Sequence, residues 1–217
     1  MKKVYFILML FIFPSVLHAN ACDGVKNEAE IIFYSSYGDL NYDLTRSKEY
    51  LSNLATQSGI HEGFVAGGLA VASLELSISL VSSTQYTDPN DACVIPKKVN
   101  VFIGYQKPTI YVANHLERES CRFFVTLRHE QAHMQINKKA LEYFLPHFKV
   151  ALNDITSLVK PINVTDINDI NKATENLNQQ YYDEIMPLVK RFNEILSDEQ
   201  MKLDVQSNYD YEKTLCK

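Results

Sequence analysis

The stretch from Ser120 to Leu145 constrains the fold more than any other part of the chain, because it contains neither glycine nor proline. Its apolar residues recur at helical spacing, which indicates one buried stripe on an amphipathic α-helix. The stripe consists of Phe124, Val125, Leu127, Ala132, Ile136, Ala140, Leu141 and Phe144. We therefore predict a helix here, followed by a second helix from about Pro146 to about Val159, since proline is favourable in a first turn.

Residues 129–133 of this helix read His-Glu-Gln-Ala-His, the pattern HExxH. Side chains four residues apart lie on one helix face, with Cβ atoms about 5–6 Å apart, so His129 and His133 can bind one metal ion together. Glu130 is rotated by about 100° from His129 and can reach a water molecule on that ion. The pattern predicts a zinc site, and the alternative is a surface helix whose histidines are merely solvated.

A catalytic zinc site normally has three protein ligands and one position open to water. The third ligand must therefore lie outside the pentapeptide, and the residues alone do not identify it. Glu142 would face away from His133 on a continuous helix. Residues 201–212 interrupt the helical pattern and concentrate acids and tyrosines, so we expect a structured, non-helical loop there. His115 and the pair His61-Glu62 are interpreted as structural.

The first 21 residues predict a secretory signal peptide. A basic start is followed by an apolar run over residues 4–16 and a small-x-small ending, which favours cleavage after Ala21. This run is too short for a membrane-spanning helix, and no later run reaches the roughly 18 apolar residues required. We expect a secreted or periplasmic protein without stable membrane insertion.

Four cysteines in an exported chain predict disulfide bonds, and four cysteines allow three pairings. We favour Cys93 with Cys121, which would fix the HExxH helix to a preceding strand, and Cys22 with Cys216, which would join the chain ends. Lipid attachment at Cys22 is an alternative, but it would leave an odd number of cysteines. Unpaired buried thiols are the other alternative.

The mature chain predicted in this way is acidic, with 19 basic and 26 acidic residues and a net charge of −7 when histidine is neutral. It has no basic run, which argues against binding to nucleic acid or to an anionic membrane. Its length, about 196 residues, suits one domain that spans residues 22–217.

The N-terminal half has the alternation and turn signals of a small antiparallel sheet. Strands are predicted at 31–34, 69–81, 99–103 and 109–113, turns at 37–39 and 88–91, and a short helix at 47–58. After the HExxH region, Asn163 to Asp166 supplies an N-cap for a long amphipathic helix over residues 167–195, with a kink at Pro187. We therefore predict one α+β domain.

The order of these elements resembles a family of secreted bacterial zincin-like proteins of uncharacterised function that are described as zinc-dependent proteases. In that family the helix reads His-Glu-Gln-Gly-His and a late segment reads Tyr-Asp-x-Glu-Thr-x-His. Here Ala132 replaces glycine, while Asp204, Ser207 and Tyr209 match the late segment with tyrosine in place of its histidine. The resemblance extends over about residues 70–215. It implies that the sheet packs on a zincin-like HExxH helix and a C-terminal long-helix region.

The resemblance carries roles over to His129, Glu130 and His133. Together with the acid-rich character of the late segment, it places Asp204 first as the third ligand. The alternatives are Tyr209, Asp210, Glu212 and an acid on the long helix. Tyr209 is also a candidate donor of a hydrogen bond to an oxyanion.

The leading hypothesis is an exported zinc-dependent hydrolase, a metallopeptidase that acts on a peptide or protein substrate. Glu130 would remove a proton from a metal-bound water, which then attacks a carbonyl. If the strand at 109–113 forms the sheet edge beside the cleft, it could align an extended substrate by strand addition. An amide in peptidoglycan is a second substrate class. The alternatives are a non-catalytic exported metal-binding or partner-binding protein, and an adhesion or inhibitor domain without metal.

Overall fold

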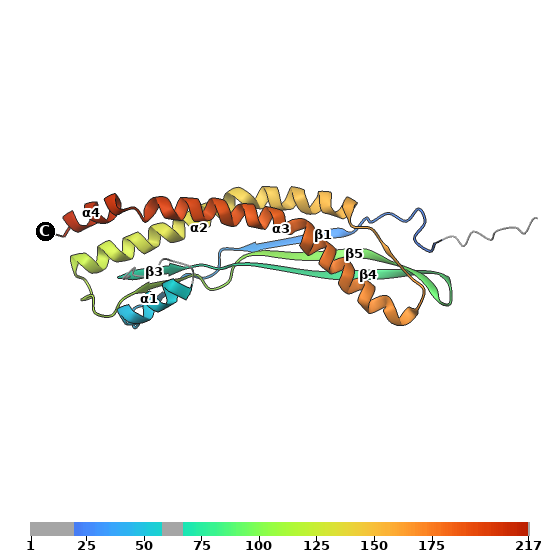
Figure 1. Ribbon diagram of the computed structural model, residues 1–217, viewed down its shortest axis with the longest axis horizontal. Coiled ribbons are helices and arrows are strands. Elements are labelled where there is room, and N and C mark those ends of the chain that lie inside the picture. The colour runs from blue at the N-terminus through green and yellow to red at the C-terminus, as the bar shows by residue number, and fades with distance from the viewer. Residues whose placement is uncertain (1–19, 58–66, 217) are drawn as a thin grey trace, which may run out of the picture.

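The structure is a computed structural model that describes residues 20–57 and 67–216 (Figure 1). The predicted signal peptide, up to residue 19, and the pair His61-Glu62 lie outside the described residues. The elements are β1 (Glu30–Ser36), β2 (Asn41–Asp43), α1 (Lys48–Gln57), β3 (Gly68–Val71), β4 (Leu74–Asp88), β5 (Asp91–Tyr105), β6 (Thr109–Val112), α2 (Cys121–Leu158), β7 (Ile162–Val164), the short 3-10 helix η1 (Ile167–Asp169), α3 (Ile170–Leu203) and α4 (Gln206–Thr214).

The strands form two sheets, and the predicted α+β class is confirmed. In the larger sheet, β5 pairs with β1 in parallel and with β4 and β7 antiparallel. In the smaller sheet, β6 lies between β2, which is parallel to it, and β3, which is antiparallel. The sheets are therefore mixed rather than purely antiparallel. The strand predicted at 69–81 is two strands, β3 and β4, which belong to different sheets.

Helices α2 and α3 lie side by side along one face of the larger sheet (Figure 1). Their facing stripes and the inner face of β5 form the main core. Its members include Val99, Val101 and Ile103 from β5, Leu141, Phe148 and Leu152 from α2, and Leu177, Ile185 and Phe192 from α3. Burying one such side chain contributes about 1.5–3 kcal/mol, so this shared core fixes the two long helices against the sheet.

Helix α2 begins with Ser120 as N-cap and continues without interruption through Pro146. The predicted second helix beginning at Pro146 is therefore wrong. Proline removes one helical hydrogen bond, but Phe144 and Phe148 on either side pack against Phe192 of α3, with ring centroids 5.4 and 6.3 Å apart. Tertiary packing thus outweighs the local cost. Helix α3 also continues through its proline, Pro187, and bends along its length as expected (Figure 1).

The C-terminal segment differs from the predicted loop. Helix α3 extends to Leu203, and α4 begins at Gln206, so only a short break separates them. The side chain of Asn208 bridges this break by donating hydrogen bonds to the carbonyl oxygens of Lys202 and Leu203. Helix α4 has no buried side chain, so no apolar periodicity marks it in the sequence.

All four cysteines form disulfide bonds, as predicted, but the favoured pairing is wrong. Cys22 pairs with Cys93, and Cys121 pairs with Cys216. Cys93 lies near the start of β5, a strand of 15 residues, which extends over about 45–50 Å at 3.2–3.4 Å per residue. Cys121 follows the other end of that strand, far beyond the roughly 7 Å that a disulfide can span between Cα atoms. The two bonds indicate an oxidising compartment.

The long strand β4 lies at an edge of the larger sheet in the described part of the chain. Tyr182 of α3 covers two polar groups of this edge. Its hydroxyl accepts a hydrogen bond from the backbone N–H of Ile78 at 3.0 Å and lies 3.4 Å from the carbonyl oxygen of Leu76, to which it donates. Within the described ranges, none of the helices has the length and apolar character needed to cross a bilayer.

Candidate metal centre

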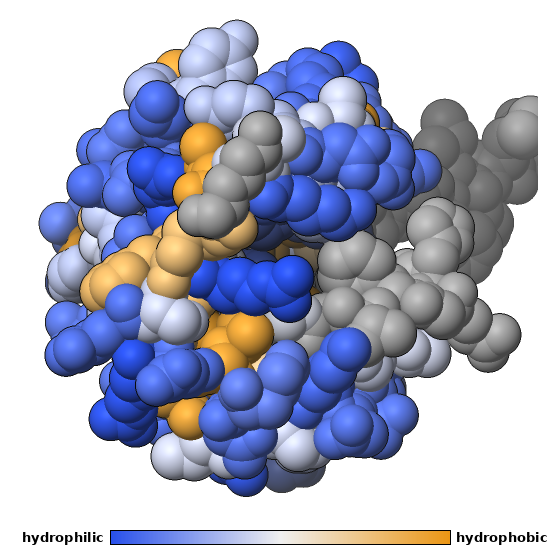
Figure 2. Space-filling model, turned by 90° about the vertical axis from the view of Figure 1, so that its left-hand side faces the viewer, coloured by the Kyte–Doolittle hydropathy of each residue, from blue (hydrophilic) through white to orange (hydrophobic). Residues whose placement is uncertain are grey.

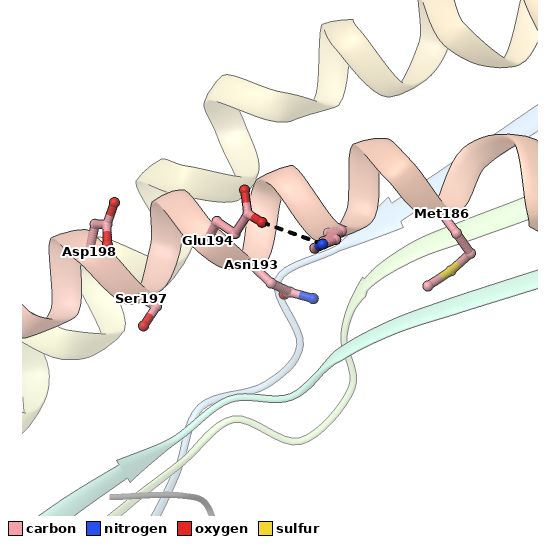
Figure 3. A pocket seen from close by; sticks show the side chains of 6 residues that line it. Met186, Asn193, Glu194, Ser197 and Asp198 are labelled. Atoms are coloured by element: carbon pink, nitrogen blue, oxygen red, sulfur yellow. Dashed lines mark ion pairs between the residues drawn. The ribbon is translucent and has the colours of Figure 1, made fainter.

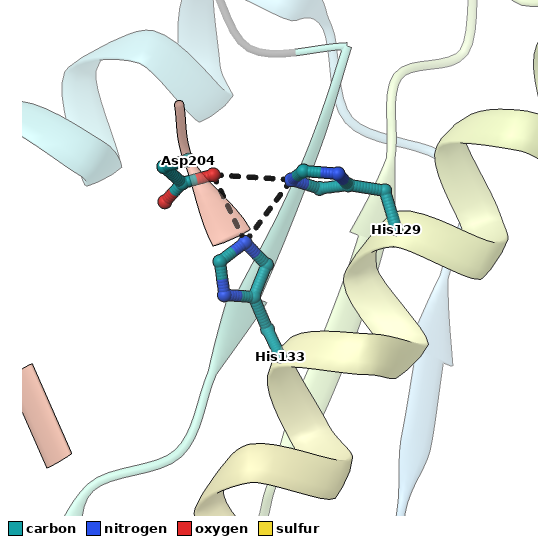
Figure 4. A group of neighbouring side chains, drawn as sticks. All are labelled: His129, His133 and Asp204. Atoms are coloured by element: carbon teal, nitrogen blue, oxygen red, sulfur yellow. Dashed lines mark hydrogen bonds and ion pairs between the residues drawn. The ribbon is translucent and has the colours of Figure 1, made fainter. Parts of the chain in front are cut away.

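His129 and His133 project from α2 toward Asp204, which caps the C-terminus of α3 (Figure 4). The Nε2 atoms of the two histidines are 3.1 Å apart, and each is 3.1 Å from Oδ1 of Asp204. Three donor atoms from two helices therefore form a triangle with equal sides.

This triangle fits a tetrahedral metal ion. Separations of 3.1 Å are short enough for one ion to contact all three atoms at the usual distances of about 2.0–2.2 Å from zinc to imidazole nitrogen and carboxylate oxygen. The side chains of His129 and His133 are only 6% and 11% exposed, whereas that of Asp204 is 39% exposed. A fourth ligand could therefore approach from the solvent side.

The second nitrogen of each imidazole has its own acceptor. Nδ1 of His129 lies 2.9 Å from Oε1 of Glu212 on α4, and Nδ1 of His133 bonds Oε1 of Gln200 on α3. Gln200 also donates its Nε2 to the backbone oxygen of His133 at 3.2 Å. Acceptors at Nδ1 favour the tautomer that keeps its proton there and leaves Nε2 free for a metal.

Tyr209 of α4 contacts two of these residues. Its hydroxyl donates a hydrogen bond to Oδ1 of Asp204. Its ring stacks on His129 with centroids 5.3 Å apart and an interplanar angle of 30°. Tyr209 thus lies against the candidate metal-binding atoms. Its role as a hydrogen-bond donor to an oxyanion stays a prediction.

Glu130 is buried between α2 and the edge of β3, with 6% exposure. The backbone N–H of Ala70 donates a hydrogen bond to its carboxylate. Gly68 makes room for it, because a Cβ at that position would lie 2.7 Å from Cγ and Oε1 of Glu130 and from Cγ2 of Thr126. Burial raises the pKa of Glu130 to about 7, against the opposing effect of both histidines. A carboxylate with a pKa near neutrality is suited to accept and return a proton.

The electrostatics favour a cation between the ligands. Burial opposes the charged form of His129, but hydrogen bonds to Asp204 and Glu212 outweigh it and raise its pKa to about 9. The pKa of His133 is raised in the same way, through Asp204 and Gln200. Burial opposes the charge of Asp204 too, yet its hydrogen bonds with both histidines and Tyr209 hold its pKa well below the usual range. In the absence of a metal ion, protons on His129 and His133 supply the positive charge beside Asp204.

The structure brings together the predicted residues His129, Glu130, His133 and Asp204. Two of the alternative ligands, Tyr209 and Glu212, contact the ligands instead. Asp210, the other named alternative, lies elsewhere and pairs with Lys213 at 3.0 Å. Glu142, which was expected to face away, pairs with Lys138 at 4.0 Å, and His115, interpreted as structural, is exposed.

Sequence reasoning missed Gln200, because the long helix was expected to end at residue 195. A glutamine one helical turn before the acidic residue Asp204 is the signal that could have indicated it. With the full length of α3 known, the two residues are seen to reach α2 from the same helix end.

A shallow groove on α3 has a different character. It is lined by Met186, Lys190, Asn193, Glu194, Ser197 and Asp198. Met186, Asn193 and Ser197 point to the same side of the helix (Figure 3). The lining residues all come from one helix and include no histidine or cysteine, so the groove adds no metal ligand to the centre.

No family model matches this chain, and no curated protein or solved structure is significantly similar to it. Within the described residues, His129, His133 and Asp204 form the one group of three or more side chains with the spacing of metal ligands. The function must therefore be inferred from the chemistry of this group.

Proposed function

We propose that the protein is an exported zinc-dependent hydrolase, most simply a metallopeptidase of the HExxH type. The observation that carries this proposal is the triangle of donor atoms from His129, His133 and Asp204, with sides of 3.1 Å. The acceptors at both Nδ1 atoms support it, because they direct the Nε2 atoms to one point.

Each residue has a distinct task in this proposal. His129, His133 and Asp204 would hold zinc, which would supply Lewis acidity toward a carbonyl and a water molecule. Glu130 takes a proton from the attacking water and returns it to the departing amine. The contacts of Glu130 with Ala70 and Gly68 hold its carboxylate in the position from which it accepts the proton.

Strand β3, not β6, is the candidate for aligning a peptide. β6 is paired on both sides, by β2 and by β3, so the predicted strand addition at residues 109–113 is excluded. β3 is paired on one side among the described strands and contacts Glu130. An extended substrate would add to its other side and use the main-chain groups there that do not bond Glu130.

The compartment in this proposal is secreted or periplasmic. Two disulfide bonds support an oxidising environment. Export through a signal peptide of residues 1–21 remains part of the proposal. Pairing of Cys22 with Cys93 leaves no free thiol at position 22 for a lipid.

The test uses purified mature protein, zinc analysis and a fluorescently labelled unfolded protein as substrate. We expect about one zinc ion per chain, and none when both His129 and His133 are changed to Ala. Glu130→Gln should keep zinc and the fold while hydrolysis falls by roughly 10² or more. Glu142→Gln, on the same helix but exposed, is the matched control.

Two outcomes would overturn parts of the proposal. Full zinc occupancy in the double histidine variant would refute the site. Zinc binding without hydrolysis by the unaltered protein would favour the non-catalytic metal-binding alternative.

A further inference from the structure

Helix α4 is attached to the molecule chiefly by polar contacts at the metal centre and by a disulfide bond. None of its side chains is buried. Glu212 and Tyr209 contact His129 and Asp204, and Cys216, two residues after the end of α4, pairs with Cys121. Figure 2 views this end of the molecule and shows a mostly hydrophilic surface with small apolar areas. An apolar interface therefore does not explain the position of α4.

Glu212 contacts the metal centre without being part of the triangle. Its Oε1 lies 2.9 Å from Nδ1 of His129, on the side of the ring opposite to Nε2. The Glu212 side chain is 23% exposed, whereas His129 is 6% exposed. A carboxylate in this position fixes the orientation and tautomer of a metal-binding imidazole and increases its basicity.

We propose that Glu212 is a positioning residue of the metal centre and that the Cys121–Cys216 disulfide keeps it in place. This inference rests on the metal site of the proposed function, but it does not require hydrolysis. Glu212 acts through His129 and does not touch the metal or a substrate. The centre thus includes α4 as a structural part.

The position of the disulfide gives the second half of the proposal. Cys121 is the first residue of α2, the helix that carries His129, and Cys216 lies four residues after Glu212. The bond joins the two segments that must stay together for the contact of Glu212 with His129. Without it, a helix that buries no side chain would have only a few hydrogen bonds and the stacking of Tyr209 on His129 to offset the entropy of ordering.

The first test measures zinc affinity by competition with a chromophoric chelator. Glu212→Ala should weaken zinc binding about 10–100-fold. Glu212→Gln should recover most of this loss, because the amide oxygen accepts the same hydrogen bond. Asp210→Ala is the matched control, since this carboxylate on α4 bonds Gln206 and Lys213 instead. The visible spectrum of the cobalt-substituted protein should change in Glu212→Ala alone.

The second test removes each disulfide in turn. The Cys121→Ser/Cys216→Ser variant should lose zinc affinity to about the same extent as Glu212→Ala. Hydrogen exchange should become faster over residues 206–214. Adding Glu212→Ala to this variant should cause little further loss, because both changes remove the same contact. The Cys22→Ser/Cys93→Ser variant is the control and should bind zinc normally.

The outcomes separate this inference from the proposed function. Wild-type zinc affinity in Glu212→Ala would overturn the role of Glu212. Fully additive losses would overturn the role of the disulfide. If the unaltered protein binds zinc but hydrolyses nothing, the inference stands and the hydrolase proposal falls. If the unaltered protein binds no metal, both fall.

Discussion

At the scale of single residues, protons and a metal ion compete for the same atoms. His129 has a raised pKa, about 9, because Asp204 and Glu212 stabilise its charged form in the absence of metal. At neutral pH the imidazole is therefore protonated, and a metal can bind only when the proton leaves. The same contacts that attract a cation thus make its binding dependent on pH.

We predict that zinc affinity rises with pH between pH 6 and pH 8. This window lies below the pKa of about 9 for His129, so at least one proton is released on binding. The expected slope is about tenfold per pH unit for each proton released. Chelator competition at several pH values measures it, after correction for the protonation of the chelator itself. An affinity that does not change with pH would contradict the assignment of His129.

A second prediction concerns Gly68. An added Cβ would lie 2.7 Å from the side chains of Glu130 and Thr126, so Gly68→Ala should displace Glu130 and lower hydrolysis at least ~10-fold, within the range expected for general-base catalysis. Zinc binding should be retained, because neither neighbour is a ligand. Gly67→Ala is the matched control, since its Cβ would meet only Thr126 and Leu116, at 3.6 Å or more. Equal activity in the two variants would show that Glu130 tolerates the shift.

At the scale of elements, the sequence was most informative where a local pattern coincides with burial. The HExxH helix was predicted correctly, but its buried face is only partly the predicted stripe. Leu141 and Phe144 are buried as expected, whereas Phe124 is 54% exposed and Phe123 and Met134 are buried instead. Helix α4 was missed, because it buries nothing and leaves no periodic pattern. Gln200 was missed for a related reason: its role depends on where α3 ends relative to α2. Contacts between distant elements leave no local signal.

The cysteines illustrate the same limit. Their number predicted disulfide bonds, and both bonds are formed. Their pairing depends on the length of β5, which places Cys93 and Cys121 toward opposite ends of the molecule. The prediction treated 99–103 as a short strand, whereas β5 begins at Asp91. Only the three-dimensional arrangement decides such pairings.

Helix α2 contains a local defect that its packing tolerates. Pro146 is exposed within the helix and cannot donate a backbone hydrogen bond to residue 142. Pro146→Ala should therefore stabilise the protein, by about 1–3 kcal/mol, since proline in a helix interior costs about 3 kcal/mol. Urea unfolding of the metal-free protein measures the change. A loss of stability would indicate that proline at position 146 is required for the packing of α2 on α3.

At the scale of the whole molecule, the body is elongated, and α4, which contacts the candidate metal centre, lies at one end (Figure 1). The long hairpin of β4 and β5 extends toward the opposite end (Figure 1). Cys93, which pairs with Cys22, lies near the start of β5, close to the turn of this hairpin. The other bond, Cys121–Cys216, lies at the end with α4. The two disulfide bonds therefore lie at different ends of the molecule. For this reason, removal of Cys22–Cys93 can act as the control for removal of Cys121–Cys216.

The hydroxyl of Tyr182 has a consequence for the solubility of the protein. An uncovered edge strand is a template on which another copy can add a strand, and β4 is 15 residues long. Tyr182→Phe would uncover the N–H of Ile78 and the carbonyl of Leu76. We expect this variant to self-associate as its concentration rises, in sedimentation velocity, while Tyr143→Phe, an exposed tyrosine on α2, stays unchanged. Equal sedimentation of both variants would contradict this. If the two variants differ as expected, the hydroxyl oxygen of Tyr182 on α3 sets the protein concentration at which copies begin to pair edge to edge.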